Sequence, residues 1–153
     1  MRLSRALIAL SAVLGAGCSG SAASPANPCN GIAYPLVFPA VFLSYPSNAS
    51  TNVPTSIGEV VVDGAAVNQS VLSLSTGATT VVSATPAPAP SPLPSPLATP
   101  PAGITPSYSS ITVPTLGRAT TYSVTYTYIV TSSAAPQCSM TTSVPLGSFS
   151  TSP

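Results

Sequence analysis

The sequence predicts an all-β protein, a β-sandwich of short strands joined by turns, and three observations lead to this fold class. Residues 120–131 alternate apolar and hydroxyl-bearing side chains, the period of two that is typical of a half-buried strand. Other short apolar segments are separated by Pro, Gly, Asn and Ser, which favour turns. After residue 17 no segment has the apolar period and the caps of a helix. In a chain of 153 residues, such strands favour a sandwich over a barrel.

Residues 1–17 are predicted to form an export signal and to be no part of the fold. Arg2 and Arg5 precede an apolar run that reaches Gly17, and Cys18 follows immediately. This segment resembles the signal of bacterial lipoproteins, with residues 14–17 (Leu-Gly-Ala-Gly) before the cysteine. The resemblance implies that Cys18 is acylated, that it becomes the new N-terminus, and that its lipid anchors the chain to a membrane outside the cytoplasm.

Residues 18–30 are predicted to be a flexible tether, because they are mostly small, polar or proline. Residues 31–153 then form one domain, since an exported chain of about 136 residues suits a single core. If Cys18 carries lipid, Cys29 and Cys138 remain as an even pair in an oxidising compartment, and we expect a disulfide between them. It would close a loop of about 109 residues and contribute roughly 4–5 kcal/mol. Two buried free thiols are the alternative.

The expected strands are short apolar segments that follow one another along the chain. The first is broken by Pro39, and the second ends at the turn dipeptide Asp63-Gly64. The alternating strand leads through a turn at residues 132–137 into a return strand. The expected ranges are 36–45, 57–63, 71–74, 79–84, 120–131 and 138–149, and the inward side chains of the alternating strand are Tyr122, Val124, Tyr126, Tyr128 and Val130.

Residues 85–107 form a proline-rich insertion between the expected strands. Eight prolines fall between residues 86 and 101. Because proline fixes φ and lacks an N–H, such a run is excluded from helices and from the middle of a sheet, and it favours polyproline II. Two interpretations are open: a stiff surface excursion between two strands, or a ligand for a groove lined with aromatic side chains. The absence of charged residues around the repeat favours the first.

Three segments resemble parts of immunoglobulin-like domains. Residues 116–124 (Leu-Gly-Arg-Ala-Thr-Thr-Tyr-Ser-Val) are similar to a strand junction in fibronectin type III and bacterial Ig-like domains. Tyr45-Pro46 with Asn52-Val53-Pro54 resembles the first strand of the Ig-like domains in bacterial surface proteins of the SbsA type, and residues 147–151 resemble their last strand. The resemblance covers roughly residues 40–151 and implies an Ig-like Greek-key sandwich. It also implies a structural tyrosine corner, in which the Tyr122 hydroxyl bonds to backbone a few residues upstream.

The exported part keeps only three charged side chains, Glu59, Asp63 and Arg118, and it has no Lys and no His. One Arg cannot displace the counterions of a nucleic acid, so nucleic-acid binding is excluded. The common general bases and activated nucleophiles are also absent, so no catalytic residue is expected. Metals that prefer nitrogen or sulfur lack ligands, and a calcium site built on two acids is a minor alternative.

Glu59 and Asp63 lie four residues apart on an expected strand, which places them on one face about 13 Å apart. Paired carboxylates of glycosidases are roughly 5–9.5 Å apart, so these two make a poor acid–base couple. We expect both to face solvent while Val60 and Val62 point inward. Arg118 is interpreted as a solvated turn side chain, with a clamp for a carboxylate ligand as the alternative.

The sequence therefore predicts a non-catalytic lipoprotein of the bacterial cell envelope, with no cofactor and no metal, that serves envelope structure, adhesion or protein–protein interaction. Its expected partners are the membrane, through the lipid on Cys18, and a protein or glycan of the envelope. Ser19 resembles the residue after the cysteine in lipoproteins that move to an outer membrane. The alternative is a surface module that binds carbohydrate or another uncharged compound, with Tyr34, Tyr45 and Tyr108 as a stacking platform.

Overall fold

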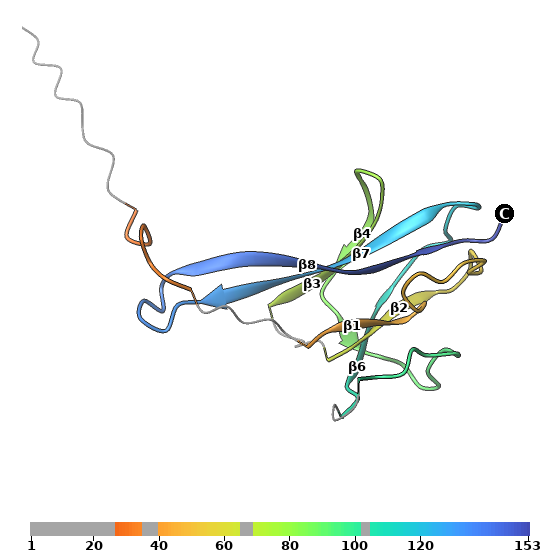
Figure 1. Ribbon diagram of the computed structural model, residues 1–153, viewed down its shortest axis with the longest axis horizontal. Helices are drawn as coiled ribbons and strands as arrows, with labels where there is room; N and C mark the ends of the chain where they lie inside the picture. The colour runs from red at the N-terminus through yellow and green to blue at the C-terminus, as the bar shows by residue number, and fades with distance from the viewer. Residues whose placement is uncertain (1–26, 35–39, 65–68, 102–104) are drawn as a thin grey trace, which may run out of the picture.

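The computed structural model describes residues 27–34, 40–64, 69–101 and 105–153. Within these ranges the chain forms β-strands and no helix, so the all-β prediction is confirmed (Figure 1). The strands form two antiparallel sheets of four strands each. In spatial order, the first sheet contains β1 (Phe42–Tyr45), β2 (Glu59–Asp63), β6 (Tyr108–Thr112) and β5 (Ala87–Pro88), and the second contains β4 (Thr79–Ala84), β3 (Ser70–Thr76), β7 (Thr121–Thr131) and β8 (Ser139–Ser150).

The two sheets share one hydrophobic core, which is the arrangement of a β-sandwich. Both sheets contribute alternate side chains to it, because successive residues of a strand point to opposite faces. The first sheet provides Leu43, Val60, Val62 and Ile111, and the second provides Leu72, Leu74, Tyr122, Val124, Tyr126 and Phe149, all of them buried. The predicted sandwich is therefore confirmed at this level.

The β7–β8 hairpin is the longest element of the molecule and follows its predicted pattern. Of the five side chains expected to point inward from β7, Tyr128 is half-buried and the other four are buried. The hydroxyl-bearing residues between them lie on the outer face. There they form cross-strand pairs: Thr127 with Ser143 at 2.9 Å and Thr121 with Ser150 at 2.8 Å. Such pairs are the unit by which a sheet is stabilised. The outer face of the hairpin therefore carries hydroxyl groups and the exposed Ile129, and no charged side chain.

The strand boundaries agree with the expected ranges in most of the chain. The strand expected at 79–84 is β4, and those expected at 120–131 and 138–149 are β7 and β8 to within one residue at each end. The expected first strand is shorter, because β1 begins at Phe42; its residues 36–39 lie outside the described residues. Two strands, β5 and β6, were not expected.

The turn after β2 requires glycine at position 64. Gly64 has a φ of 80°, in the left-handed region, and a Cβ there would collide with the carbonyl oxygen of Ala40. The predicted Asp63-Gly64 turn ends β2. It needs glycine for two reasons, the left-handed backbone conformation and the close approach of the Ala40 carbonyl. The turn holds the segment before β1 against the end of β2.

The proline-rich segment folds back along the first sheet. Ala87 of β5 pairs with Ser110 of β6, and Pro86 is fully buried. Further along, the Ala98 N–H donates to the Ser44 carbonyl of β1 at 2.9 Å, and the Ala89 N–H donates to the Tyr108 carbonyl at 3.1 Å. Because β5 lies at a sheet edge, its proline removes no bond from the middle of the sheet.

The predicted signal and the acylation residue Cys18 lie outside the described residues. In the described part of the chain, no helix has the length and apolar character needed to cross a membrane.

Candidate functional site

Cys29 and Cys138 form a disulfide, as predicted, with their Cα atoms 5.5 Å apart. The alternative of two free thiols is thereby excluded. Cys138 directly precedes β8 and is fully buried, whereas Cys29 belongs to the segment at residues 27–34 and is half-buried. The bond therefore joins the beginning of the described chain to the end of the β7–β8 hairpin, 109 residues later in the sequence.

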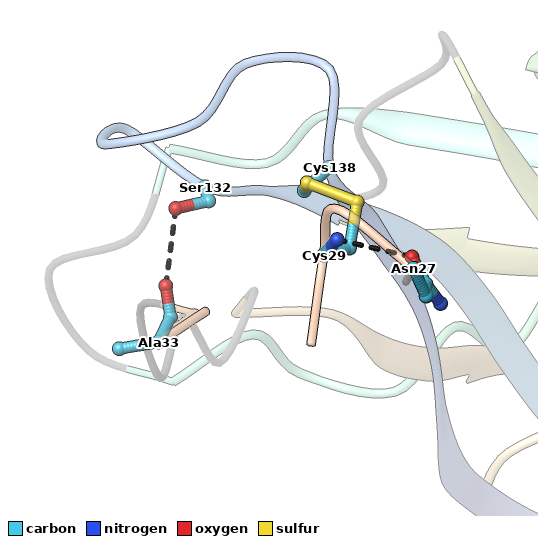
Figure 2. The surroundings of a disulfide bond; sticks show 5 residues. All are labelled: Asn27, Cys29, Ala33, Ser132 and Cys138. Atoms are coloured by element: carbon cyan, nitrogen blue, oxygen red, sulfur yellow. Dashed lines mark hydrogen bonds between the residues drawn. A yellow bond between two sulfur atoms is a disulfide. The ribbon is translucent and has the colours of Figure 1, made fainter. Parts of the chain in front are cut away.

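Hydrogen bonds on both sides of the disulfide hold its two segments in place (Figure 2). The Ser132 hydroxyl donates to the Ala33 carbonyl at 3.1 Å, which ties the turn between β7 and β8 to the N-terminal segment. The Cys29 N–H donates to Asn27 Oδ1 at 3.0 Å. Within the turn, the Ser132 N–H donates to the Cys138 carbonyl at 3.0 Å. We call the disulfide together with the Ser132–Ala33 bond the clamp.

The tyrosine at the start of β7 connects this strand to the loop before it. The Tyr122 hydroxyl accepts a hydrogen bond from the Gly117 N–H, five residues upstream, at 2.7 Å. Its ring stacks on Phe149 of β8 with centroids 5.7 Å apart. Thr151 completes the contact, because its hydroxyl donates to the Gly117 carbonyl at 2.6 Å. A Cβ at position 117 would lie 3.3 Å from the tyrosine oxygen, so the close approach favours glycine.

The expectation that Asp63 faces solvent is wrong. Asp63 is fully buried, and the Ser107 N–H donates to its Oδ1 at 2.6 Å. Its other carboxylate oxygen is buried without a hydrogen-bond partner among the described residues. The physical reason is tertiary: the end of the proline-rich segment passes the end of β2, where the Gly64 N–H also donates to the Ser107 carbonyl at 3.0 Å.

The other two charged side chains of the described residues, Glu59 and Arg118, lie away from Asp63. Glu59 is half-buried at the opposite end of β2, and Arg118 is exposed in the loop before β7. The inward orientation predicted for Val60 and Val62 is confirmed, since both are fully buried in the core. Sequence reasoning thus located the inner face of β2 correctly and missed the burial of its last residue.

We expect Asp63→Ala to lower the free energy of unfolding by about 1–3 kcal/mol, because it removes the acceptor of the Ser107 N–H in a partly buried hydrogen bond. Asp63→Asn keeps an acceptor at this position and removes an unpaired buried charge, so it is expected to cost less than the alanine variant. Urea denaturation of both variants measures the difference. A larger loss of unfolding free energy for Asp63→Asn than for Asp63→Ala would contradict the proposed role of the Ser107–Asp63 bond.

The three tyrosines predicted as a stacking platform are all half-buried: Tyr45 ends β1, Tyr108 begins β6, and Tyr34 precedes both strands in the chain. A surface depression of about 340 Å³ on the second sheet has Thr127, Tyr128 and Ile129 in its lining. A second depression, of about 280 Å³, lies between the Tyr45–Pro54 region and residues 95–96 of the proline-rich segment. Only Tyr45 of the three expected tyrosines lines either one, so neither depression assembles the predicted platform.

Ser132, Ala33 and Thr151 have structural contacts that the sequence analysis missed, because serine, alanine and threonine are common in this chain and none of the three carries a local signal.

Across the described ranges, no group of three or more His, Cys, Asp or Glu side chains lies close enough to hold a metal ion. In comparisons with known proteins, no family model, no curated protein and no solved structure matches this chain.

Proposed function

We propose that this chain is a non-catalytic lipoprotein of the bacterial cell envelope, in which lipid on Cys18 anchors an Ig-like domain that takes part in protein–protein interaction. The observation that best supports the Ig-like part of this proposal is the strand order of the two sheets. If β1 to β8 are lettered in sequence as A, B, C, C′, D, E, F and G, the first sheet reads A-B-E-D and the second reads C′-C-F-G. This is the strand distribution of immunoglobulin domains.

Tyr122 supports the same proposal from a separate observation. In Ig-like sandwiches, a tyrosine near the start of strand F bonds through its hydroxyl to backbone a few residues upstream. Tyr122 is the second residue of β7, the strand in the F position, and its hydroxyl accepts the Gly117 N–H. Strand order and the hydroxyl contact therefore both support the proposed Greek-key Ig-like fold.

The disulfide supports an extracytoplasmic location, because structural disulfides form and persist in oxidising compartments. It also bears on the proposed anchor. Cys29 follows Cys18 by eleven positions in the sequence, so a lipid on Cys18 would be attached close to the clamp. The domain would then be held to the membrane at the end of the β7–β8 hairpin.

The non-catalytic part of the proposal rests on the distribution of charge. Asp63 is buried against Ser107, Glu59 lies at the other end of the same strand, and Arg118 is exposed in a loop. General acid–base catalysis needs a titratable group within hydrogen-bond reach of the reacting proton. The two carboxylates, at opposite ends of β2, are not placed to share a substrate, which favours an interaction role over an enzymatic one.

The anchor is tested by the intact mass of the protein extracted from bacterial membranes after expression of the full chain. We expect the mass of a chain that starts at Cys18 and carries covalent lipid. Cys18→Ala should lose the lipid and leave the membrane fraction, whereas the neighbouring substitution Ser19→Ala should retain both. Recovery of a wild-type chain that begins at Met1, or of an unmodified Cys18, would contradict the proposal.

A further inference from the structure

We propose that the first half of β8, residues 139–144, is a docking edge at which a second copy of this chain adds its own β8 in antiparallel orientation. Two four-stranded sheets would then join into one continuous sheet. The inference rests on the proposed interaction role, and it identifies the partner as a second copy of the chain. The pairing uses the backbone of the second sheet, and it requires no lipid.

The outer side of this half-strand is open among the described residues. β8 lies at the edge of the second sheet and pairs with β7 on one side only. In its second half the other side is covered, because the Ala49 N–H donates to the Ser148 carbonyl at 2.7 Å and the Val53 N–H donates to the Ser150 carbonyl at 3.0 Å. No described backbone group makes a comparable bond to the outer side of residues 139–144.

The other three sheet edges carry the features by which proteins block edge-to-edge pairing. β1 has a register shift between Leu43 and Tyr45, and its Ser44 carbonyl is occupied by the Ala98 N–H. β5 is two residues long and contains Pro88. β4 has an extra residue, Val81, between the residues paired with Leu74 and Ser75.

Residues 139–144 have none of these protections. The sequence Ser-Met-Thr-Thr-Ser-Val contains no charge and no proline, and its pairing with β7 runs without a shift from Ser139 to Val144. Met140 adds an apolar component, because its side chain is 41% exposed and is one of two large hydrophobic side chains left exposed in the described chain. Pairing at this edge would cover it.

The register with β7 identifies the outward backbone groups. Pro145 faces Thr125 and has no N–H, so this pair exchanges no bonds. Because bonded and non-bonded pairs alternate in an antiparallel ladder, the N–H and C=O groups of Ser139, Thr141 and Ser143 point away from β7. The Ser132 N–H bond to the Cys138 carbonyl fits the same alternation.

The outward N–H and C=O groups of residues 139–144 can pair with the same groups of a second copy. A two-fold axis at Thr141 places Thr141 opposite its own copy and Ser139 opposite Ser143 of the other copy, so that every outward N–H meets a carbonyl. On the outer face, hydroxyl then meets hydroxyl, as Thr127 already meets Ser143 within the sheet at 2.9 Å. The absence of charge means that no like charges oppose each other across the axis. The matched hydroxyl side chains of Ser139, Thr141 and Ser143, together with the absence of opposing charge, favour a second copy as the partner.

The test places a single cysteine on the axis in the full chain, which keeps its Cys29–Cys138 disulfide. Residues that face each other in a bonded antiparallel pair have Cα atoms about 5.5 Å apart, within disulfide reach. We expect mild oxidation to convert most of the Thr141→Cys protein into a covalent dimer. Thr80→Cys, an exposed position on the β4 edge, is the matched control and should stay monomeric.

A second variant separates edge pairing from accidental oxidation. Adding Ser143→Pro to Thr141→Cys removes an outward N–H and leaves the backbone bonds to β7, and the only bond to β7 that it deletes is the hydroxyl contact with Thr127 on the outer face. The yield of dimer should therefore fall at least tenfold while peptide mapping still finds the native disulfide. In sedimentation velocity, the wild type should be dimeric and Thr141→Lys monomeric, because the two lysines would face each other.

Three results would overturn the inference: equal crosslinking of Thr80→Cys and Thr141→Cys, a wild type that is monomeric by sedimentation while Thr141→Cys gives no dimer, or capture of a different protein at position 141. Acylation of Cys18 is measured separately by mass, so failure of the edge and failure of the proposed anchor are distinguishable.

Discussion

Replacing both Cys29 and Cys138 with alanine is expected to lower the free energy of unfolding by about 5 kcal/mol, the largest effect of any variant considered for this chain. The bond closes a loop with a sequence separation of 109 residues, and loop-closure entropy for that length gives roughly this value. Single domains are commonly stable by only about 5–15 kcal/mol. The melting temperature should therefore fall on the order of 20 °C, as measured by circular dichroism and urea denaturation.

Ser132→Ala is the control for this variant. It removes the hydroxyl bond to the Ala33 carbonyl and leaves the disulfide intact, so it should cost only about 1 kcal/mol. A double-alanine protein that is as stable as Ser132→Ala would show that the N-terminal segment is held by its packing and that the covalent link adds little.

The second large effect is expected at Tyr122. Its side chain is 3% exposed and stacks on Phe149, so Tyr122→Ala should cost about 3–5 kcal/mol through the cavity it leaves. Tyr122→Phe keeps the ring and deletes only the acceptor of the Gly117 N–H, for an expected loss of about 1–1.5 kcal/mol. Urea denaturation of the two variants separates the contribution of the ring from that of the hydroxyl.

Tyr108→Phe provides the matched comparison. Tyr108 is half-buried in β6, and its hydroxyl has no hydrogen bond among the described residues. Removal of that hydroxyl should change the stability by less than about 0.5 kcal/mol. Equal losses for the two phenylalanine variants would mean that the bond to Gly117 does not stabilise the start of β7.

The parts of the fold that could be predicted from the sequence are those whose signal is local. The alternation in β7 lies within one strand and predicts which side chains are buried, and the return strand follows from the turn between them. β6 has no such signal, because Ser109 and Ser110 interrupt its sequence. Both serines are nevertheless buried, since β6 lies between β2 and β5.

The same difference between local and long-range signals decides which parts of the candidate site could be predicted. The Cys29–Cys138 pairing was predictable because cysteines are few and the proposed lipid accounts for the third. The burial of Asp63 was not predictable, because its partner Ser107 lies 44 residues later in the sequence and follows a segment whose proline content indicated a surface excursion. A long-range contact of this kind depends on how the two sheets and their connections assemble, and the residues around Asp63 give no sign of it.

The disulfide also determines how the domain carries tension. All strands from β1 to β7 lie inside the covalent loop between Cys29 and Cys138, and only β8 follows it. A pull between a residue before Cys29 and Pro153 therefore passes through the sulfur atoms and bypasses the seven strands that the described residues form between the two cysteines. At about 3.3–3.6 Å per residue, residues 139–153 can lengthen to about 50 Å, against about 400 Å for the same domain with the bond reduced. While oxidised, the domain is a short mechanical link that force cannot unravel from its N-terminal side.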